Sequence, residues 1–147
     1  MRDLLWRLFG VPFSARERDA VFKRMLDGRT GAAAVDFVRA DVTHNTEKSG
    51  ALLAAEAIFL VVDLFALDQG WSKPLLIGSL LILMLCCVLA MSNLKPTLGM
   101  YRKDLGTVPA RGVFNVLLRR TFRINLALYL TFFSIVLLGG AAVISVA

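Results

Sequence analysis

Two acidic residues, Glu56 and Asp63, stand within an apolar stretch from Ala51 to Leu67 that is hydrophobic enough to enter a membrane. They are seven residues apart, so on an α-helix they lie on one face, two turns apart. A charge near the centre of a bilayer costs about 3 kcal/mol on insertion scales. We therefore expect both side chains to face the interior of a helix bundle, to pair with a basic group, or to be protonated.

Three roles are open to these two carboxylates. Arg120 or Arg123, at the entry of a later apolar helix, could extend along the membrane to pair with Glu56. The acids could also form an intramembrane polar contact between copies of the chain, or carry protons or ions. A transport path usually recruits polar residues from several helices, and the apolar run from Pro74 to Leu94 offers almost none. Pairing or an oligomer contact is therefore the favoured interpretation, with transport as the alternative.

Residue patterns for other kinds of chemistry do not occur. The only histidine, His44, has no second histidine or cysteine near it, which argues against a metal site. Cys86 and Cys87 are adjacent in an apolar run, so a disulfide between them is sterically unfavourable and we interpret them as packing residues. No nucleophile–base pair, phosphate-binding loop or zinc spacing is found. We expect no catalytic residue, no metal and no cofactor, and hence no enzyme.

The apolar stretches that position these residues predict three membrane spans. Of the 147 residues, 57% are hydrophobic and the mean hydropathy is +0.68, which is typical of an integral membrane protein. The link after the first span, DQGWSKP, is long enough only to join antiparallel helices. Two uncharged runs follow, Pro74 to Leu94 and Ile124 to Ala147, and the second holds the small-residue sequence GGAA from Gly139 to Ala142. The expected fold class is an all-α polytopic membrane protein, with a cytosolic region of residues 1–50 and three transmembrane helices within 51–147.

The segment between the second and third spans, residues 95–123, sets the predicted orientation. It carries seven basic residues and one acidic residue, so by the positive-inside tendency it is a cytoplasmic loop. The N-terminus is then cytoplasmic and the C-terminus lies on the far side. The net charge of +6 is concentrated mostly here, and we interpret it as attraction to anionic lipids in place of nucleic-acid binding. The alternative is a phosphate-bearing ligand held at a helix start by Arg119, Arg120 and Arg123.

The N-terminal region is predicted to form amphipathic helices. Ser14 and Glu17 make a capping box, so a helix should begin directly after Ser14, and Gly28 is placed to end it. Thr30 can cap a second helix that leads toward the first span without a proline. Residues 4–9 suit either a short helix lying in the headgroup region or a turn packed on its neighbours.

The junction between the second of these helices and the first span reads NTEKSGALLAAEAIFL, from Asn45 to Leu60. It resembles the small Pycsar effector transmembrane proteins of bacterial anti-phage defence, in which a polar helix ends in a motif of the type D-x-K-A-x-x-L-L just before the first span. The motif positions are matched by Lys48, Ala51, Leu52 and Leu53. Thr46 stands where the aspartate would fall. The layout is also similar, with a second span close behind the first and a third after a cytosolic segment.

The resemblance implies a small effector of the bacterial inner membrane that senses a cyclic pyrimidine nucleotide and then impairs the membrane of the infected cell. In this hypothesis the spans associate as a homo-oligomer, or rearrange, through the face of Glu56 and Asp63 and through GGAA. The alternative hypothesis is a non-catalytic accessory or assembly subunit of a larger inner-membrane complex, which would dock through the same faces.

Overall fold

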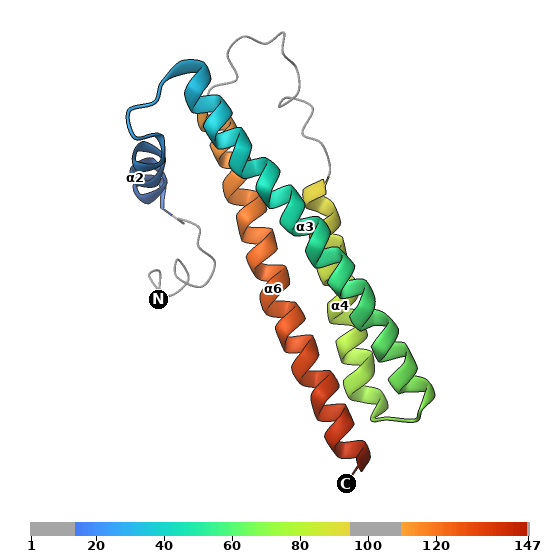
Figure 1. The fold of residues 1–147 in the computed structure, drawn as a ribbon. Helices are drawn as coiled ribbons and strands as arrows, with labels where there is room; N and C mark the ends of the chain where they lie inside the picture. Colours follow the sequence, from blue (N-terminus) through green and yellow to red (C-terminus); the bar gives the residue numbers. More distant parts are fainter. Residues whose placement is uncertain (1–13, 95–109, 147) are drawn as a thin grey trace.

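The computed structural model describes residues 14–94 and 110–146, and all regular structure within these ranges is helical (Figure 1). The helices are α2 (Ala15–Leu26), α3 (Gly31–Asp68), α4 (Lys73–Leu94) and α6 (Ala110–Val146). Three of them, α3, α4 and α6, are long and apolar enough to cross a membrane. The prediction of an all-α fold with three membrane-crossing helices is therefore confirmed. The segment predicted at residues 4–9 and the first half of the predicted loop 95–123 lie outside the described residues.

The ends of α2 follow the sequence prediction. The Ser14 hydroxyl accepts from the Glu17 N–H at 3.1 Å, and the Ser14 N–H donates to the Glu17 carboxylate at 3.1 Å. At the other end, Asp27 and Gly28 take the left-handed φ values of 43° and 78° that stop a helix. The prediction for Thr30 is only partly right. It is the N-cap residue of α3, but its side chain makes no cap hydrogen bond.

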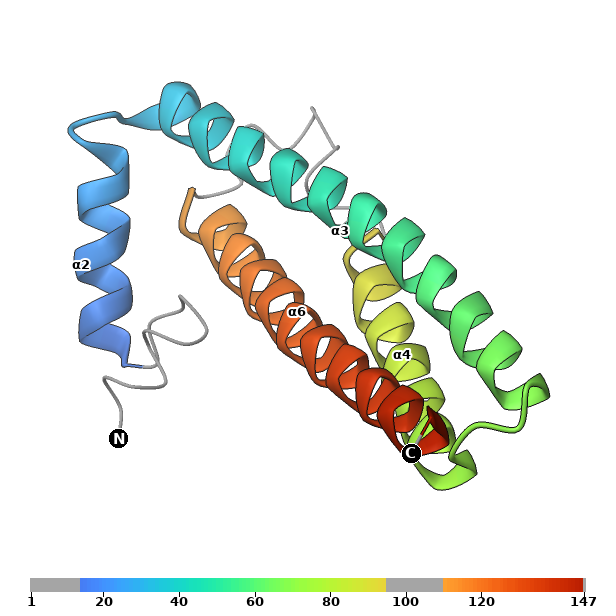
Figure 2. The same ribbon diagram turned by 60° about the horizontal axis from the view of Figure 1, so that its bottom comes forward.

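The three long helices differ in length, and the difference shapes the molecule. At about 1.5 Å per residue, the 38 residues of α3 and the 37 of α6 each extend about 55 Å, which exceeds the roughly 30 Å hydrocarbon core of a bilayer. The 22 residues of α4 extend about 33 Å, which matches that core. Both α3 and α6 therefore continue beyond α4 at one end of the bundle (Figures 1 and 2).

The turn between α3 and α4 makes these helices antiparallel neighbours. Gly70, at φ 81°, donates its N–H to the Leu67 carbonyl at 3.1 Å, and the Trp71 N–H donates to the Ala66 carbonyl at 3.1 Å. This pair of bonds is a Schellman motif, which satisfies the last carbonyls of α3. The chain then returns along α4, and α6 runs parallel to α3 (Figure 1).

The buried positions of the three long helices recur at alternating spacings of three and four residues. On α4 they are Leu76, Ser79, Leu83, Cys86, Ala90 and Asn93. On α3 they include Val38, Val42, Asn45, Ser49, Leu52, Glu56, Asp63 and Ala66. On α6 they include Leu117, Arg120, Ile124, Ala127, Thr131, Ser134 and Ala141. This spacing is that of left-handed helix bundles, in soluble proteins and in membranes alike.

Where α3 and α6 extend past α4, α2 packs against them. We call this part the α2 lobe: α2 with the first turns of α3 and α6. Its buried core consists of Val38, Val42, Val113, Phe114, Leu117 and Leu118. Phe22 of α2 packs on this core, with its ring centroid 5.0 Å from that of Phe114. Asp19 of α2 also forms an ion pair with Arg111 of α6. The lobe and the bundle thus share two unbroken helices.

The bundle packing predicts different effects for two leucines of α4. Leu83 is 0% exposed, whereas Leu81 is 63% exposed on the outer surface. We expect Leu83→Ala to lower the free energy of unfolding by about 2 kcal/mol or more, because it leaves a cavity between helices. Leu81→Ala should change it by less than about 0.5 kcal/mol. Unfolding of the purified variants by SDS in mild detergent measures both values, and equal losses would contradict the packing.

Candidate functional site

Both acids of the first apolar stretch lie inside the bundle. Glu56 and Asp63 are each 0% exposed and belong to the buried face of α3 that meets α4 and α6. A contact between copies of the chain through this face would therefore require the bundle to open. Ala141, from the GGAA sequence, is likewise internal and packs with Ala66 and Leu76.

Glu56 is held from α6. The Thr131 hydroxyl lies 3.2 Å from Glu56 Oε1 and 2.9 Å from the carbonyl oxygen of Ala127, so its one proton is shared between two acceptors. The Cys87 thiol of α4 lies beside the same carboxyl group. Within the described ranges, Glu56 Oε2 has no hydrogen-bond partner. This carboxyl group is thus only partly satisfied.

The predicted pairing of Glu56 with Arg120 or Arg123 is wrong for the described part of the chain, where Glu56 forms no ion pair. Arg120 Nη1 instead donates to Thr46 Oγ1 at 2.6 Å. The reason is the stagger of the two parallel helices. Their hydrogen bonds join residues 74 to 76 positions apart, which places Thr131 level with Glu56. Arg123 is eight residues earlier than Thr131, or about 12 Å along the helix, and Arg120 is farther still.

Asp63 lies two turns after Glu56 on α3, farther from the α2 lobe, near a pair of hydroxyl groups. Ser79 of α4 faces it, and the Ser79 and Ser134 hydroxyl oxygens are 2.6 Å apart. Only one of these two hydroxyls donates to the other, and the proton of the second is free to turn toward another acceptor. Neither carboxyl oxygen of Asp63 has a hydrogen-bond partner among the residues that the structure describes. Buried polar groups in native proteins are nearly always hydrogen-bonded, so this carboxyl group calls for a specific explanation.

The second span contributes polar groups that the sequence prediction missed. It was expected to offer almost none, and this expectation is wrong, because Ser79 and Asn93 are both 0% exposed in the bundle interior. The Asn93 amide donates to Ser49 Oγ of α3 at 3.3 Å, while Asn93 Oδ1 has no partner among the described residues. A signal was available: Ser79, Cys86 and Asn93 are spaced by seven residues, so they share one face of α4.

Together these groups form a line of polar side chains along the bundle axis, which we call the polar seam. Its members are Asn45, Ser49, Glu56 and Asp63 of α3, Ser79 and Asn93 of α4, and Arg120, Thr131 and Ser134 of α6. At the end next to the α2 lobe, the Asn45 amide also donates to Thr121 Oγ1 at 2.9 Å. All three long helices therefore contribute to it.

One apolar layer interrupts the polar seam and a second one ends it. The layer nearer the α2 lobe consists of Leu52, Cys86 and Ala127, one residue from each helix, and it separates Ser49 from Glu56. The second layer consists of Ala66, Leu76 and Ala141 and lies beyond Asp63. The section of the seam that holds both acids is therefore closed at each end.

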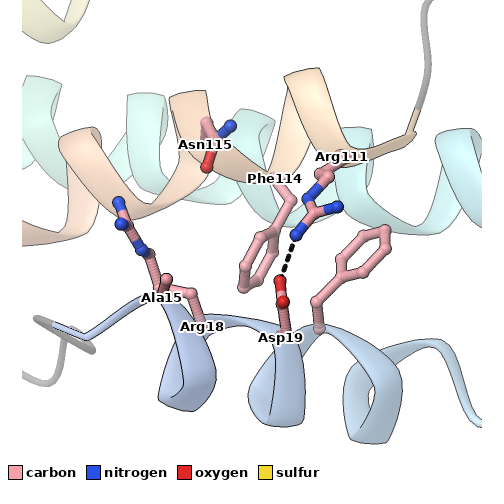
Figure 3. Close-up of a pocket in the computed structure, with 7 residues that line it drawn as sticks. Ala15, Arg18, Asp19, Arg111, Phe114 and Asn115 are labelled. Carbon is pink, nitrogen blue, oxygen red and sulfur yellow. Dashed lines mark hydrogen bonds and ion pairs between the residues drawn. The ribbon is translucent and has the colours of Figure 1, made fainter.

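A separate surface hollow lies in the α2 lobe (Figure 3). It has a volume of about 180 Å³ and is lined by Ala15, Arg18, Asp19, Phe22, Arg111, Phe114 and Asn115. Arg18 of α2 and Asn115 of α6 point toward it, and the Arg111–Asp19 ion pair closes one side (Figure 3). Two guanidinium groups and an amide can hold a phosphate, but the volume is smaller than the roughly 300–1,000 Å³ of pockets that enclose whole drug-sized ligands.

The arginines predicted to hold a phosphate do not form a single cluster at a helix start. Arg119 is exposed, Arg120 is buried and Arg123 is half-buried, and α6 begins at Ala110, so these residues lie well within the helix. Of the residues assigned to the family motif, Lys48 and Ala51 are exposed, Leu53 is half-buried and Leu52 belongs to the first apolar layer. The assignment of Ala51 is wrong, because the alanine of the motif directly follows the lysine and this position is held by Ser49.

No protein-family model, curated protein or solved structure matches the chain.

The unsatisfied carboxyl group of Asp63 predicts an unusual stability effect. Asp63→Val, which removes both unpartnered oxygens, should raise the free energy of unfolding by about 1 kcal/mol or more, because the desolvation penalty disappears. The same substitution at the exposed Asp41 of α3 serves as the control and should have little effect. SDS titration in mild detergent measures both. A marked destabilisation by Asp63→Val would show that this carboxyl group holds the bundle together.

Proposed function

We propose that the chain is a small effector of the bacterial inner membrane, which responds to a phosphate-bearing signal by impairing the membrane. One observation carries this proposal. Helices α3 and α6 run unbroken from the α2 lobe, where the hollow lies, to the section of the polar seam that contains Glu56 and Asp63. A change in how these two helices pack in the lobe would therefore reach the seam directly.

The polar seam supports this proposal because it is the part of the bundle that is least well satisfied. In lipid the hydrophobic effect does not drive helices together, because the acyl chains are as apolar as the helix surfaces. Helix association therefore depends on packing and on interhelical hydrogen bonds. Glu56 and Asp63 leave three of their four carboxyl oxygens without partners among the described residues. Each such group lowers the free energy needed to rearrange the bundle.

The hollow of the α2 lobe is the proposed entry point of the signal. A phosphate placed there would contact Arg18 and would compete with Asp19 for the guanidinium group of Arg111. Because Asp19 belongs to α2 and Arg111 to α6, this exchange would alter the packing of one helix on the other. The resemblance of residues 45–60 to Pycsar effectors supports a cyclic pyrimidine nucleotide as the signal, with its phosphate in the hollow.

The proposed orientation follows from charge. The described part of the basic segment, residues 110–123, is the first part of α6 and lies at the same end of the bundle as the α2 lobe, so the positive-inside tendency favours a cytoplasmic lobe and a C-terminus on the far side. In this orientation the hollow faces the compartment where a nucleotide signal is made. Anionic lipids of the inner leaflet are the expected membrane partners of the basic segment.

The proposal predicts a signal-dependent loss of membrane potential. Bacteria that express the chain should depolarise when a nucleotide cyclase producing cyclic CMP or cyclic UMP is induced, as measured with a potential-sensitive dye. Arg18→Gln and Arg111→Gln should each reduce the response about tenfold, because each removes a charge-assisted contact to the phosphate. Arg24→Gln, also on the exposed surface of α2 but outside the hollow, is the matched control.

Two results would contradict the proposed function. One is the absence of depolarisation with and without the cyclase, at verified expression. The other is stoichiometric co-purification with a larger membrane complex, which is the expectation for an accessory subunit.

A further inference from the structure

We infer that the polar seam is a proton path, held closed in this conformation by the two apolar layers. The inference rests on the proposed function, because it names the ion whose movement would impair the membrane. Buried oxygen atoms whose hydrogen-bonding capacity is unused are the first sign of a proton path. Both oxygens of Asp63, Glu56 Oε2 and Asn93 Oδ1 are buried and lack hydrogen-bond partners within the described ranges. All four are acceptors, so they suit a proton or a protonated water.

The acids cannot exchange a proton directly. Seven residues separate them, or about 10 Å along the helix, whereas proton transfer requires heavy atoms about 2.6–3.2 Å apart or a bridging water. Hydroxyl groups of the other two helices occupy this interval. The Thr131 hydroxyl donates a hydrogen bond to Glu56, and Ser134 lies one turn later on α6. The Ser134 hydroxyl is hydrogen-bonded to that of Ser79, which faces Asp63. Leu83 of α4 lies between the two levels, so the relay runs on the α6 side.

Each hydroxyl can pass a proton without a net chemical change. A hydroxyl oxygen accepts one proton while its own O–H proton leaves to the next acceptor, so no other bond is broken and one proton moves from carboxyl to carboxyl. The interval between Thr131 and Ser134 would be bridged by water that enters when a layer opens. The other titratable groups beside Glu56 are the thiols of Cys86 and Cys87 on α4. Neither uncharged run, Pro74 to Leu94 or Ile124 to Ala147, brings a charge toward the acids.

The geometry favours protons over metal cations. Helices α4 and α6 touch through the Ser79 and Ser134 oxygens, which are 2.6 Å apart. A sodium or potassium ion that followed this line would have to separate the two hydroxyls, whereas a proton can move along their hydrogen bond. Beyond these groups, the layers of Leu52, Cys86, Ala127 and of Ala66, Leu76, Ala141 exclude water at either end. Hydrophobic constrictions of this kind gate membrane paths by excluding water.

Proton flux into liposomes tests the path with the full-length purified chain. Leu52→Ser combined with Leu76→Ser replaces the largest residue of each layer with a group that admits water, and we call this double variant the open-layer chain. Leu64→Ser combined with Leu81→Ser is the matched control, because these residues lie on the same two helices but are 58% and 63% exposed on the outer surface. With pyranine inside the vesicles and a potassium–valinomycin potential as the driving force, the open-layer chain should carry protons about tenfold faster than the wild type and the control.

Removal of the carboxyl groups then tests the carriers. In the open-layer chain, adding Glu56→Gln and Asp63→Asn should return the flux to the control rate, a loss of about tenfold. Adding Glu56→Asp instead retains a carboxyl group and should retain most of the flux, although it disturbs the packing more than Gln does. This comparison separates loss of a proton carrier from loss of structure, and circular dichroism with gel filtration verifies the fold of each variant.

Several outcomes would overturn the proton path. They are a flux in the open-layer chain equal to that of its matched control, a flux that persists without both carboxyl groups, and parallel release of a trapped dye, which would indicate a non-selective pore. Signal-driven depolarisation of cells that persists in the Glu56→Gln/Asp63→Asn chain would also overturn it, while leaving the effector function intact. Conversely, layer-dependent proton flux without any signal-driven depolarisation would support the path and contradict the effector function.

Discussion

Inside a bilayer a polar side chain finds no water, so each polar group between the helices has to be satisfied by another helix or remain without a partner. This constraint explains most of the arrangement around the polar seam. Asn45 and Ser49 meet Thr121 and Asn93, and Glu56 meets Thr131. Asp63 is the exception, because neither of its carboxyl oxygens has a hydrogen-bond partner among the described residues. Hydrogen bonding between the helices is therefore most complete near the α2 lobe and least complete around Asp63. A rearrangement of the helices would break the fewest hydrogen bonds around Asp63.

The same two helices connect the satisfied and unsatisfied parts. Because α4 is only as long as the hydrocarbon core, α3 and α6 project beyond it, and α2 covers them there through Phe22 and the contact of Asp19 with Arg111. A ligand that changed this contact would act on helices that continue to Glu56 and Asp63 without a break. The signal site and the membrane site of the proposed effector thus lie on the same two continuous helices.

Local sequence signals predicted the elements well, because caps and apolar runs act over a few residues. The Ser14–Glu17 capping box and the seven-residue spacing of Glu56 and Asp63 are examples. Which side chains form hydrogen bonds with each other across two helices was not predictable in this way. Arg120 bonds Thr46 and not Glu56 because of the stagger of α6 on α3, which local patterns do not determine. The buried Ser79 and Asn93 were missed because a run without charge was interpreted as a run without polar function, although their heptad spacing with Cys86 was visible in the sequence.

The central claim is that the acids are enclosed by the three helices of a single chain, and a disulfide tests it most directly. Ser79 and Ser134 have hydroxyl oxygens 2.6 Å apart, so cysteines at these positions can form a disulfide. In a chain with Cys86 and Cys87 replaced by alanine and a protease site inserted between α4 and α6, oxidation in native membranes should join the two fragments of one monomer after cleavage. Fragments that separate without reductant, or that are joined only as dimers of the chain, would contradict the enclosed seam.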